Sequence, residues 1–417
     1  MRLDEFIEGF ERDAAAERRR LAREKSYAIT DHLEDVKEQF ERVVQGDSLF
    51  GSTAPEIFVG RSNYPEVSTG VLSPMDRAAD PAEFATSGEW YRRGFDIDDV
   101  LQYRTGLLNS TRSSRVNVED VWDGFVGVQR EVAIADHPVD VEVGLDGSPE
   151  IDLTLDDITT PTGPRARARD ADLAENPHVP RPVEKTLEDD DWRAEGAMTY
   201  LYRRGFDVYD VNTILSAGAL GRGRARRLVP TRWSITAVDD TVGQYLQGRL
   251  RNAPSVDEVQ VWYNEYIGND YWVILAPGNW EFELVELKAP GSIWNPDPEG
   301  DYYMAADSEA HEGRTAYVEE TSGAYYASRL ATLEHLAEID RQATCLVVRH
   351  ASESYWAPVG VWQIREGIRH AFEGEPATAE TFHDAIGQLA PTLPVSLADL
   401  RRKSKLVAGI QSQLTDF

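Results

Sequence analysis

The spacing of apolar and polar residues predicts a chain of mixed helices and strands. Helical spacing of apolar residues marks residues 1–45, Val118–Ala133, a helix from about Thr241, Tyr317–Ile339, Arg365–Phe372 and Ala379–Leu389. Short alternating or continuous apolar runs predict strands at Val139–Leu145, Glu150–Leu155, Trp233–Val238, Glu258–Tyr266, Tyr271–Leu275, Trp280–Lys288, Thr344–Val348 and Pro358–Ile364. A Pro- and Arg-rich linker is expected at Pro161–Pro182.

One ten-residue segment occurs twice. Tyr91–Val100 reads YRRGFDIDDV and Tyr202–Val211 reads YRRGFDVYDV. In each copy the glycine suits the end of one helix, and the aspartate two residues later suits the N-cap of the next. The sequence therefore predicts a duplicated helix-turn-helix element, and we expect the two copies to form a pseudo-symmetric pair.

These elements predict an α/β fold, in which helices surround a mixed sheet. We divide the chain into a charged helical segment over residues 1–48 and a duplicated α/β region with Gly/Arg loops over residues 49–250. A second α/β region with a strand meander covers residues 251–395, and a flexible tail covers residues 396–417.

The charge of the chain indicates the solvent to which its surface is adapted. The chain has 417 residues and a net charge of −30, and only six of its 43 basic residues are lysine. Dispersed acid with scarce lysine is typical of a surface adapted to molar salt, where screening removes self-repulsion. An ordinary acidic protein is the alternative.

The single cysteine, Cys345, excludes a disulfide scaffold and a zinc ribbon, and we predict no zinc and no resident metal. With no apolar run long enough to span a membrane and no apolar leader, we predict a cytoplasmic protein without membrane contact.

The last residues carry a peptide motif. Gln411, Leu414 and Phe417 form Q-x-x-L-x-x-F, which one helical turn would gather on one side. That pattern is typical of peptides that plug an apolar pocket on the sliding clamp PCNA, so we predict PCNA as a partner. The usual form has two aromatic residues, and this chain has one. A frayed amphipathic terminus is the alternative.

Arginines crowd the segment that follows the second repeat. Arg222, Arg224, Arg226, Arg227 and Arg232 lie within eleven residues, with Gly221 and Gly223 between them. Guanidinium groups suit phosphate, and glycine lets the backbone approach it closely, so we predict contact with DNA or a nucleotide. Ion pairing with the abundant carboxylates explains the cluster equally well.

A third pattern indicates nuclease chemistry. Asp270, Glu286 and Lys288 fit D…E-x-K, in which carboxylates hold Mg²⁺ and lysine stabilises developing phosphate charge. Alternation places Glu286 and Lys288 on one face of a predicted strand. The pattern is short, and a strand end that reaches solvent also explains it. Catalysis is therefore left open, and Mg²⁺ is expected only for a nuclease.

Several longer segments resemble the archaeal Nre family of DNA repair proteins, NreA type. They are FVGRSNYP, GALGRGRARRLVPTRWSITAVDD, WEFELVELKAPGSIWN, HEGRTAYVEETSGAYYASRLATLEHL, PVGVWQIREGIR and the terminal QSQLTDF. The resemblance implies a role in the repair of damaged DNA and assigns clamp binding to Gln411, Leu414 and Phe417. Many members of the family look to have an N-terminal zinc-ribbon segment with cysteine ligands. This chain has no cysteine in that region. The resemblance names no catalytic residue.

The combined prediction is a DNA repair factor that PCNA recruits and that contacts DNA or a nucleotide through its Gly/Arg segments. Two alternatives stay open. One is a metal-dependent nuclease that uses Asp270, Glu286 and Lys288, and the other is an adaptor that binds PCNA without touching DNA.

Overall fold

The computed structural model describes residues 48–409, except for residues 77, 119–121, 123, 147–161, 296 and 298. Three predictions lie outside the described residues. They are the N-terminal helix over residues 1–45, the strand at Glu150–Leu155 and the clamp motif of Gln411, Leu414 and Phe417.

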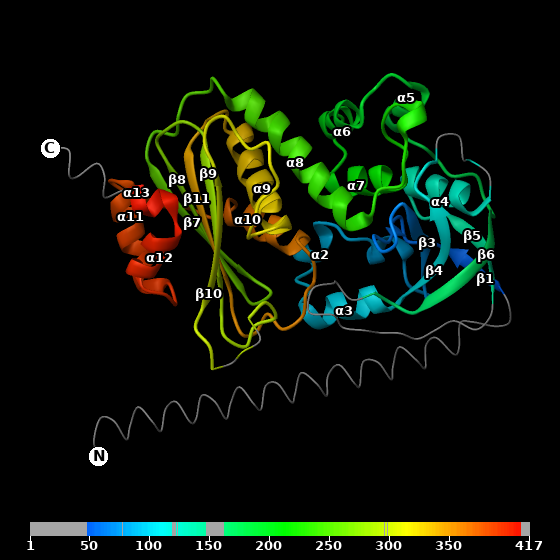
Figure 1. Cartoon of the computed structure of the whole chain (residues 1–417), viewed down its shortest axis with the longest axis horizontal. Helices are drawn as coiled ribbons and strands as arrows, with labels where there is room; N and C mark the ends of the chain where they lie inside the picture. The colour runs from blue at the N-terminus through cyan, green and yellow to red at the C-terminus, as the bar shows by residue number, and fades with distance from the viewer. Residues whose placement is uncertain are drawn as a thin grey trace, which may run out of the picture. The chain divides into compact units, whose positions relative to one another are not determined.

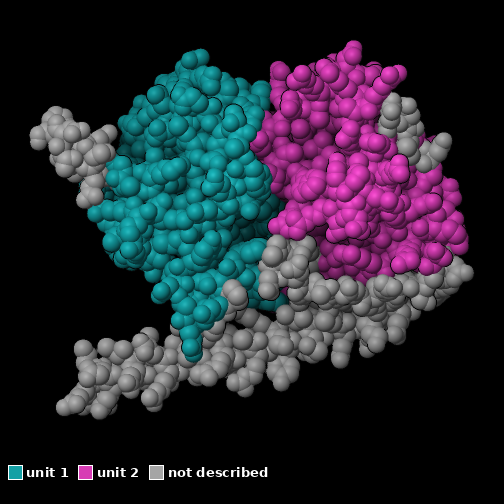
Figure 2. All heavy atoms as spheres, in the orientation of Figure 1, with its two compact units in different colours: residues 1–31, 157–159, 243–417 teal, residues 32–156, 160–242 magenta. Residues whose placement is uncertain are grey.

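Two units divide the chain (Figures 1 and 2). Unit 2 holds residues 32–156 and 160–242, and unit 1 holds residues 243–417 with the short stretches 1–31 and 157–159. The division falls inside helix α8 (Thr231–Leu250). The strand predicted at Trp233–Val238 was therefore wrong, and the helix expected from about Thr241 already begins at Thr231. Buried side chains recur every fourth residue from Val238 to Leu250, a helical period that outweighs the β-branched composition.

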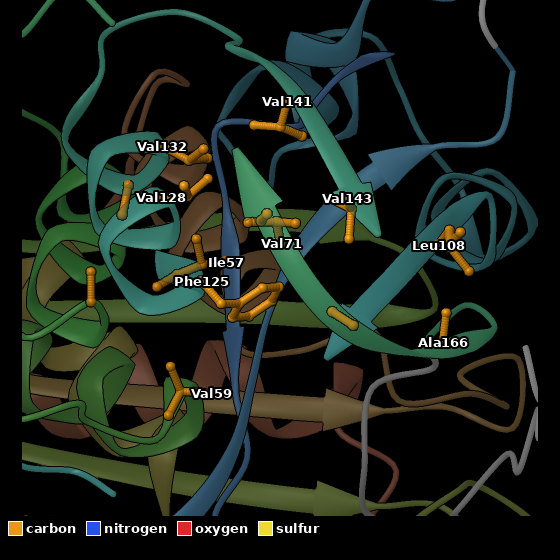
Figure 3. Close-up of a cluster of buried hydrophobic side chains, with 14 of the residues drawn as sticks. Ile57, Val59, Val71, Leu108, Phe125, Val128, Val132, Val141, Val143 and Ala166 are labelled. Carbon is orange, nitrogen blue, oxygen red and sulfur yellow. The ribbon is translucent and has the colours of Figure 1, made fainter. Parts of the chain in front are cut away.

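Unit 2 is built on a six-stranded sheet in the order β1-β5-β6-β4-β3-β2, in which β4 and β6 run parallel and the other neighbours run antiparallel. Its strands are β1 (Ser48–Ser52), β2 (Ile57–Val59), β3 (Glu66–Pro74), β4 (Leu107–Arg115), β5 (Asp140–Leu145) and β6 (Arg165–Leu173). Helix α4 (Gly124–Ile134) packs on the sheet, and Figure 3 shows the buried side chains between them.

Strand β6 corrects the linker predicted at Pro161–Pro182. Its sequence RARARDADL looks too polar for a strand, but Ala166, Ala168 and Ala171 are buried while the charged residues between them face outward. The small alanine side chains allow α4 to pack close to this strand of the sheet. The sequence does alternate between alanine and charged residues, but alanine is only weakly apolar, so the alternation did not predict a strand.

The duplicated element is confirmed at the level of local structure. Helices α2 (Glu89–Arg92) and α3 (Ile97–Thr105) form the first copy, and α6 (Ala194–Arg203) and α7 (Val208–Ser216) form the second. The two repeat glycines have positive φ angles of 70° and 91°, and each repeat aspartate closes a capping box. The copies then diverge, because the first continues into strand β4 and the second into an irregular loop. Unit 2 also holds α5 (Arg181–Glu188), η1 (Pro81–Phe84) and η2 (Gly223–Ala225).

Unit 1 has its own six-stranded sheet, in the order β10-β9-β11-β8-β7-β12. Its strands are β7 (Val259–Tyr266), β8 (Asn269–Ala276), β9 (Glu281–Lys288), β10 (Tyr303–Glu309), β11 (Thr344–Ala351) and β12 (Ala377–Ala379). Strands β9 and β11 run parallel, and the other neighbours run antiparallel. Both sheets are thus mixed, which confirms the predicted fold class. The meander β7-β8-β9 and strand β11 lie where the sequence predicts them, whereas β10 was missed.

Helices cover both faces of this sheet (Figure 1). They are α9 (Gly323–Glu338) and α10 (Trp362–Ala371) on one face, and α11 (Phe382–Leu389), η3 (Ala390–Thr392), α12 (Leu397–Lys403) and α13 (Lys405–Gly409) on the other. The strand predicted at Pro358–Ile364 was wrong, because this segment leads into α10.

The C-terminal segment is more integrated than the predicted tail over residues 396–417. Leu400 and Val407 are buried in the core. The buried carboxylate of Glu283 accepts hydrogen bonds from Ser404 Oγ at 2.6 Å and from the backbone N–H of Lys405 at 2.7 Å and Leu406 at 2.9 Å. Glu283 therefore caps the N-terminus of α13, and unit 1 holds the chain in place as far as that helix.

Candidate functional site

The Gly/Arg loop begins where α7 ends. Gly218 follows the C-cap of α7 with a φ of +69°, which favours glycine. A Cβ atom there would lie 2.8 Å from the backbone of Arg227 and 2.6 Å from Val118. Gly223 packs against Asp190, whose Oδ1 atom would be 2.7 Å from an added Cβ. Helix termination and close packing therefore explain Gly218 without a bound phosphate, whereas Gly223 meets only the end of the exposed Asp190 side chain.

Arg226 is buried and holds the loop against α5. Its Nε donates to the carbonyl oxygen of Gly221 at 3.0 Å, and its Nη2 donates to those of Leu187 at 2.9 Å and Thr186 at 3.2 Å. The exposed carboxylate of Asp190 lies 3.6 Å away as an ion-pair partner. The side chain is 5% exposed, so we assign Arg226 a structural role rather than a phosphate-binding one.

The other four arginines of the cluster, Arg222, Arg224, Arg227 and Arg232, are exposed. Arg222 Nε donates to the backbone oxygen of Asp191 at 3.4 Å. Residue 227 also joins the short β-bridge to Asn117, which fixes the backbone of the loop. Arg222, Arg224 and Arg227 are therefore exposed on an ordered loop and Arg232 is exposed in the first turn of α8, which is an arrangement that suits phosphate.

We expect Arg226→Gln to destabilise unit 2. The substitution leaves at least two buried carbonyl oxygens without a donor, at about 1–3 kcal/mol each. A loss of about 3 kcal/mol would lower the melting temperature by roughly 6–12 °C for a unit of this size. Calorimetry at constant salt measures this change. Arg227→Gln, which removes the same charge from an exposed neighbour, should melt like the wild type. Equal melting of all three proteins would contradict the structural role.

The structure does not bring the D…E-x-K residues together. Asp270 pairs in register with His350, whereas Glu286 pairs with Arg349, the preceding residue of β11. Successive residues of a strand point to opposite faces of the sheet. The Asp270 carboxylate, which accepts from His350 Nδ1 at 2.9 Å, therefore lies on the opposite face from Glu286. The predicted pairing of Glu286 with Lys288 on one face is found, but the third residue is absent from it.

Glu286 is satisfied by protein charges. Its carboxylate lies 2.5 Å from Arg349 Nη1 and 3.2 Å from Lys288 Nζ, and all three side chains are buried. Burial alone would lower the pKa of the Arg349 guanidinium, but the charge of Glu286 raises it above its ordinary value. These contacts make a buried ion-pair network that neutralises charge on an apolar face, and they give the nuclease alternative no support.

One group of metal-ligating side chains occurs among the described residues. Asp136 Oδ1 lies 2.6 Å from His137 Nδ1, and its Oδ2 lies 2.8 Å from His178 Nδ1. Partial burial raises the pKa of Asp136, but the two histidine hydrogen bonds outweigh it and lower the pKa below its usual range. The three side chains are exposed and satisfy one another. The expectation of no resident metal stays a prediction.

Comparison with known sequences decides the family. The archaeal Nre N-terminal family matches residues 21–295, and the archaeal Nre C-terminal family matches residues 309–417. The chain belongs to the archaeal Nre family. A relative from Haloferax volcanii named DNA repair protein NreA is 68% identical over 420 residues, covering 100% of both chains.

Two relatives from Archaeoglobus fulgidus are more distant. DNA repair protein NreA is 38% identical over 353 residues, which is 84% of this chain and 87% of that protein. DNA repair protein NreB is 35% identical over 370 residues, which is 88% of this chain and 92% of that protein. No solved structure matches this Nre chain. Within its described residues, no helix combines the length and apolar character that crossing a bilayer requires.

Sequence reasoning overlooked two exposed aromatic side chains of this Nre protein. Tyr64 and Trp233 lie in FVGRSNYP and PTRWSITAVDD, segments that carried the family resemblance. A large ring in an apolar run is usually a core residue, so the strand predicted at Trp233–Val238 favoured burial of Trp233. Only the glycine and proline punctuation around Tyr64, typical of a surface loop, could have indicated its exposure.

Proposed function

We propose that this protein is a DNA repair factor that PCNA recruits through Gln411, Leu414 and Phe417, and that contacts DNA through the exposed arginines of the Gly/Arg loop. The observation that carries the repair role is the 68% identity, over the whole chain, to a protein named DNA repair protein NreA. Two further relatives, matched over more than four fifths of this chain, are also named as DNA repair proteins.

The anchoring of α13 supports the clamp contact. Glu283 and the buried Val407 hold the chain as far as Gly409, and the seven-residue motif begins two residues later, at Gln411. A short peptide that follows directly on a fixed helix stays close to the body of the protein. Binding of the motif would therefore carry the rest of the chain to the clamp and, with it, to DNA.

The exposed arginines support the DNA contact. Positive charge is scarce in a chain of net charge −30, yet four arginines face solvent around one loop. Contacts with phosphate release counterions, so each one adds to the salt dependence of binding.

Replacing Arg222, Arg224 and Arg227 together with glutamine should weaken DNA binding. Removal of one phosphate contact should reduce the slope of log K against log salt by about 0.7–0.9. Fluorescence anisotropy with labelled DNA over a KCl series measures both quantities. Arg226 is left intact because it holds the fold.

The matched control replaces Arg92, Arg169 and Arg181 of the same unit, which are exposed and already paired with carboxylates. It changes the net charge equally, so only local effects separate the two variants. If both triple variants bind DNA alike, the assignment of this loop is wrong.

A further inference from the structure

An exposed aromatic pair stands beside the Gly/Arg loop in unit 2. Tyr64 lies in the turn before β3 and Trp233 lies in the first turn of α8, and their ring centroids are 5.4 Å apart at an interplanar angle of 50°. Their side chains are 44% and 45% exposed. Because the rings are tilted, neither covers the other, and both keep surface for a further planar group.

The backbone around this pair is fixed on both sides. Thr231 Oγ1, two residues before Trp233, accepts from Val59 N at 2.9 Å. On the other side, the carbonyl oxygen of Pro65 accepts from Val116 N at 3.0 Å. Two segments that are distant in the sequence thus hold the rings together, so the pair forms a preorganised surface for a ligand.

Three arginines lie on the backbone segments that carry or adjoin the rings. Arg61 lies three residues before Tyr64, Arg115 opposes Glu66 across β3 and β4, and Arg227 precedes Leu228, whose N–H donates to Val116 O at 2.8 Å. All three are exposed, and within the described part of the chain the structure gives none of them an ion-pair partner. We call Arg61, Tyr64, Arg115, Arg227 and Trp233 the aromatic–arginine patch.

We propose that the aromatic–arginine patch binds single-stranded DNA, with an unpaired base stacked on Tyr64 and Trp233 and with the three arginines holding the adjoining phosphates. This inference rests on the proposed function and extends it, because it names the form of DNA. The ring faces favour single strands, since a base within a duplex is already stacked on both sides.

Charge complementarity supports the same occupant. Three arginines that have no carboxylate partner among the described residues stand out in a chain with 73 acidic residues, and a phosphate backbone supplies the missing counter-charge. The expected dependence of binding on salt also favours a single strand as the ligand. Phosphate contacts lose strength as salt rises, whereas stacking depends little on ionic strength. At the molar salt for which the predicted surface adaptation suits the protein, such a contact would keep a single strand bound.

The test is fluorescence anisotropy of the full-length protein with a labelled oligothymidine at high KCl. Tyr64→Ala combined with Trp233→Ala should weaken binding roughly tenfold or more, since stacking contributes that much per base. The slope of log K against log salt should stay unchanged, because the substitutions remove no charge. Arg61→Gln combined with Arg115→Gln should instead lower the slope.

Two control variants separate stacking from folding. Phe50→Ala removes another exposed ring, from β1 of the same unit, and should bind like the wild type. Trp233→Phe keeps an aromatic face and should retain most of the affinity. Tyr64 and Trp233 are each more than half covered, so the double alanine variant should lose some stability, and its binding is measured well below its melting temperature.

Aromatic variants that bind oligothymidine at wild-type strength would overturn this inference, as would a wild-type preference for a blunt duplex. If the Arg222, Arg224 and Arg227 variant nevertheless loses binding, the proposed DNA contact stands and only the stacking site is rejected. If the wild type binds no DNA, the DNA contact and the stacking site fail together, while recruitment by PCNA is decided by its own experiment.

Discussion

Melting temperature is expected to rise steeply as KCl increases from dilute to molar concentration. The chain carries a net charge of −30, and charges that repel one another across the surface destabilise the compact state. The Debye length is about 30 Å at 0.01 M salt and about 3 Å at 1 M, so molar salt screens all but neighbouring charges. We expect a rise of roughly 10 °C or more, which corresponds to a few kcal/mol for units of this size.

The acidic run at the end of α5 shows why screening matters locally. Residues 188–191 are four consecutive acids, and Glu188, Asp190 and Asp191 are exposed. Arg181 lies 3.3 Å from Glu188, and Arg226 lies 3.6 Å from Asp190. Two arginines balance only part of four negative charges, so the run repels itself in dilute buffer and ions from solution must supply the rest.

Differential scanning calorimetry over a KCl series makes this measurement. NaCl at equal ionic strength should act similarly, because screening depends on ionic strength more than on the cation. Sucrose, which is excluded from protein surfaces but carries no charge, is the control and should stabilise the protein far less. A melting curve that ignores salt, or a rise that sucrose reproduces, would contradict adaptation to salt.

Local signals predicted local structure well. The repeat glycines and aspartates end and begin helices through contacts within a few residues, so their roles could be deduced without knowledge of the fold. The predictions for strand β6 and helix α8 were wrong because the secondary structure of both segments depends on packing against residues that are distant in the sequence. Ala166 is buried in the core cluster of unit 2, and Trp233–Val238 becomes helical because Val238 and Val242 must be buried together on one helix face.

The candidate site shows the same limit. Alternation along β9 correctly placed Glu286 and Lys288 on one face, because side-chain period is a property of a single strand. The face that Asp270 occupies depends on the register between β8 and β11, and no pattern within one strand determines that register. Likewise, five neighbouring arginines look equivalent in the sequence. Burial of Arg226 beneath its own loop follows only from the packing of that loop on α5.

Deleting Gln411–Phe417 should abolish binding to PCNA and leave the melting temperature unchanged. The motif offers two apolar side chains, Leu414 and Phe417, whose burial would contribute roughly 1.5–3 kcal/mol each before ordering costs. With added hydrogen bonds this suits a micromolar contact, for which the binding free energy is about −8 kcal/mol. Apolar burial also keeps its strength at high salt, where long-range attraction between charges is screened.

The structure determines where such a deletion should begin. A truncation of the whole predicted tail from residue 396 would remove Leu400 and Val407 from the core and would leave the carboxylate of Glu283 buried without its donors. That protein should be destabilised for reasons unrelated to the clamp. Ending the chain after Ile410 keeps α13 and its cap, so that loss of binding can be assigned to the motif alone.

Point variants make the test sharper, with isothermal titration calorimetry against PCNA at molar KCl as the measurement. Phe417→Ala should weaken binding by roughly 1.5–3 kcal/mol, which is about a 10- to 150-fold loss of affinity, because its ring is the largest apolar group of the motif. Gln413→Ala, which lies between the motif positions, should bind like the wild type. A synthetic peptide of residues 405–417 should bind with an affinity close to that of the full chain, since the motif supplies the contact. If the deletion variant binds at wild-type strength, or if the peptide fails to bind while the full chain binds tightly, the clamp contact lies in the folded units and the assignment to Gln411, Leu414 and Phe417 is wrong.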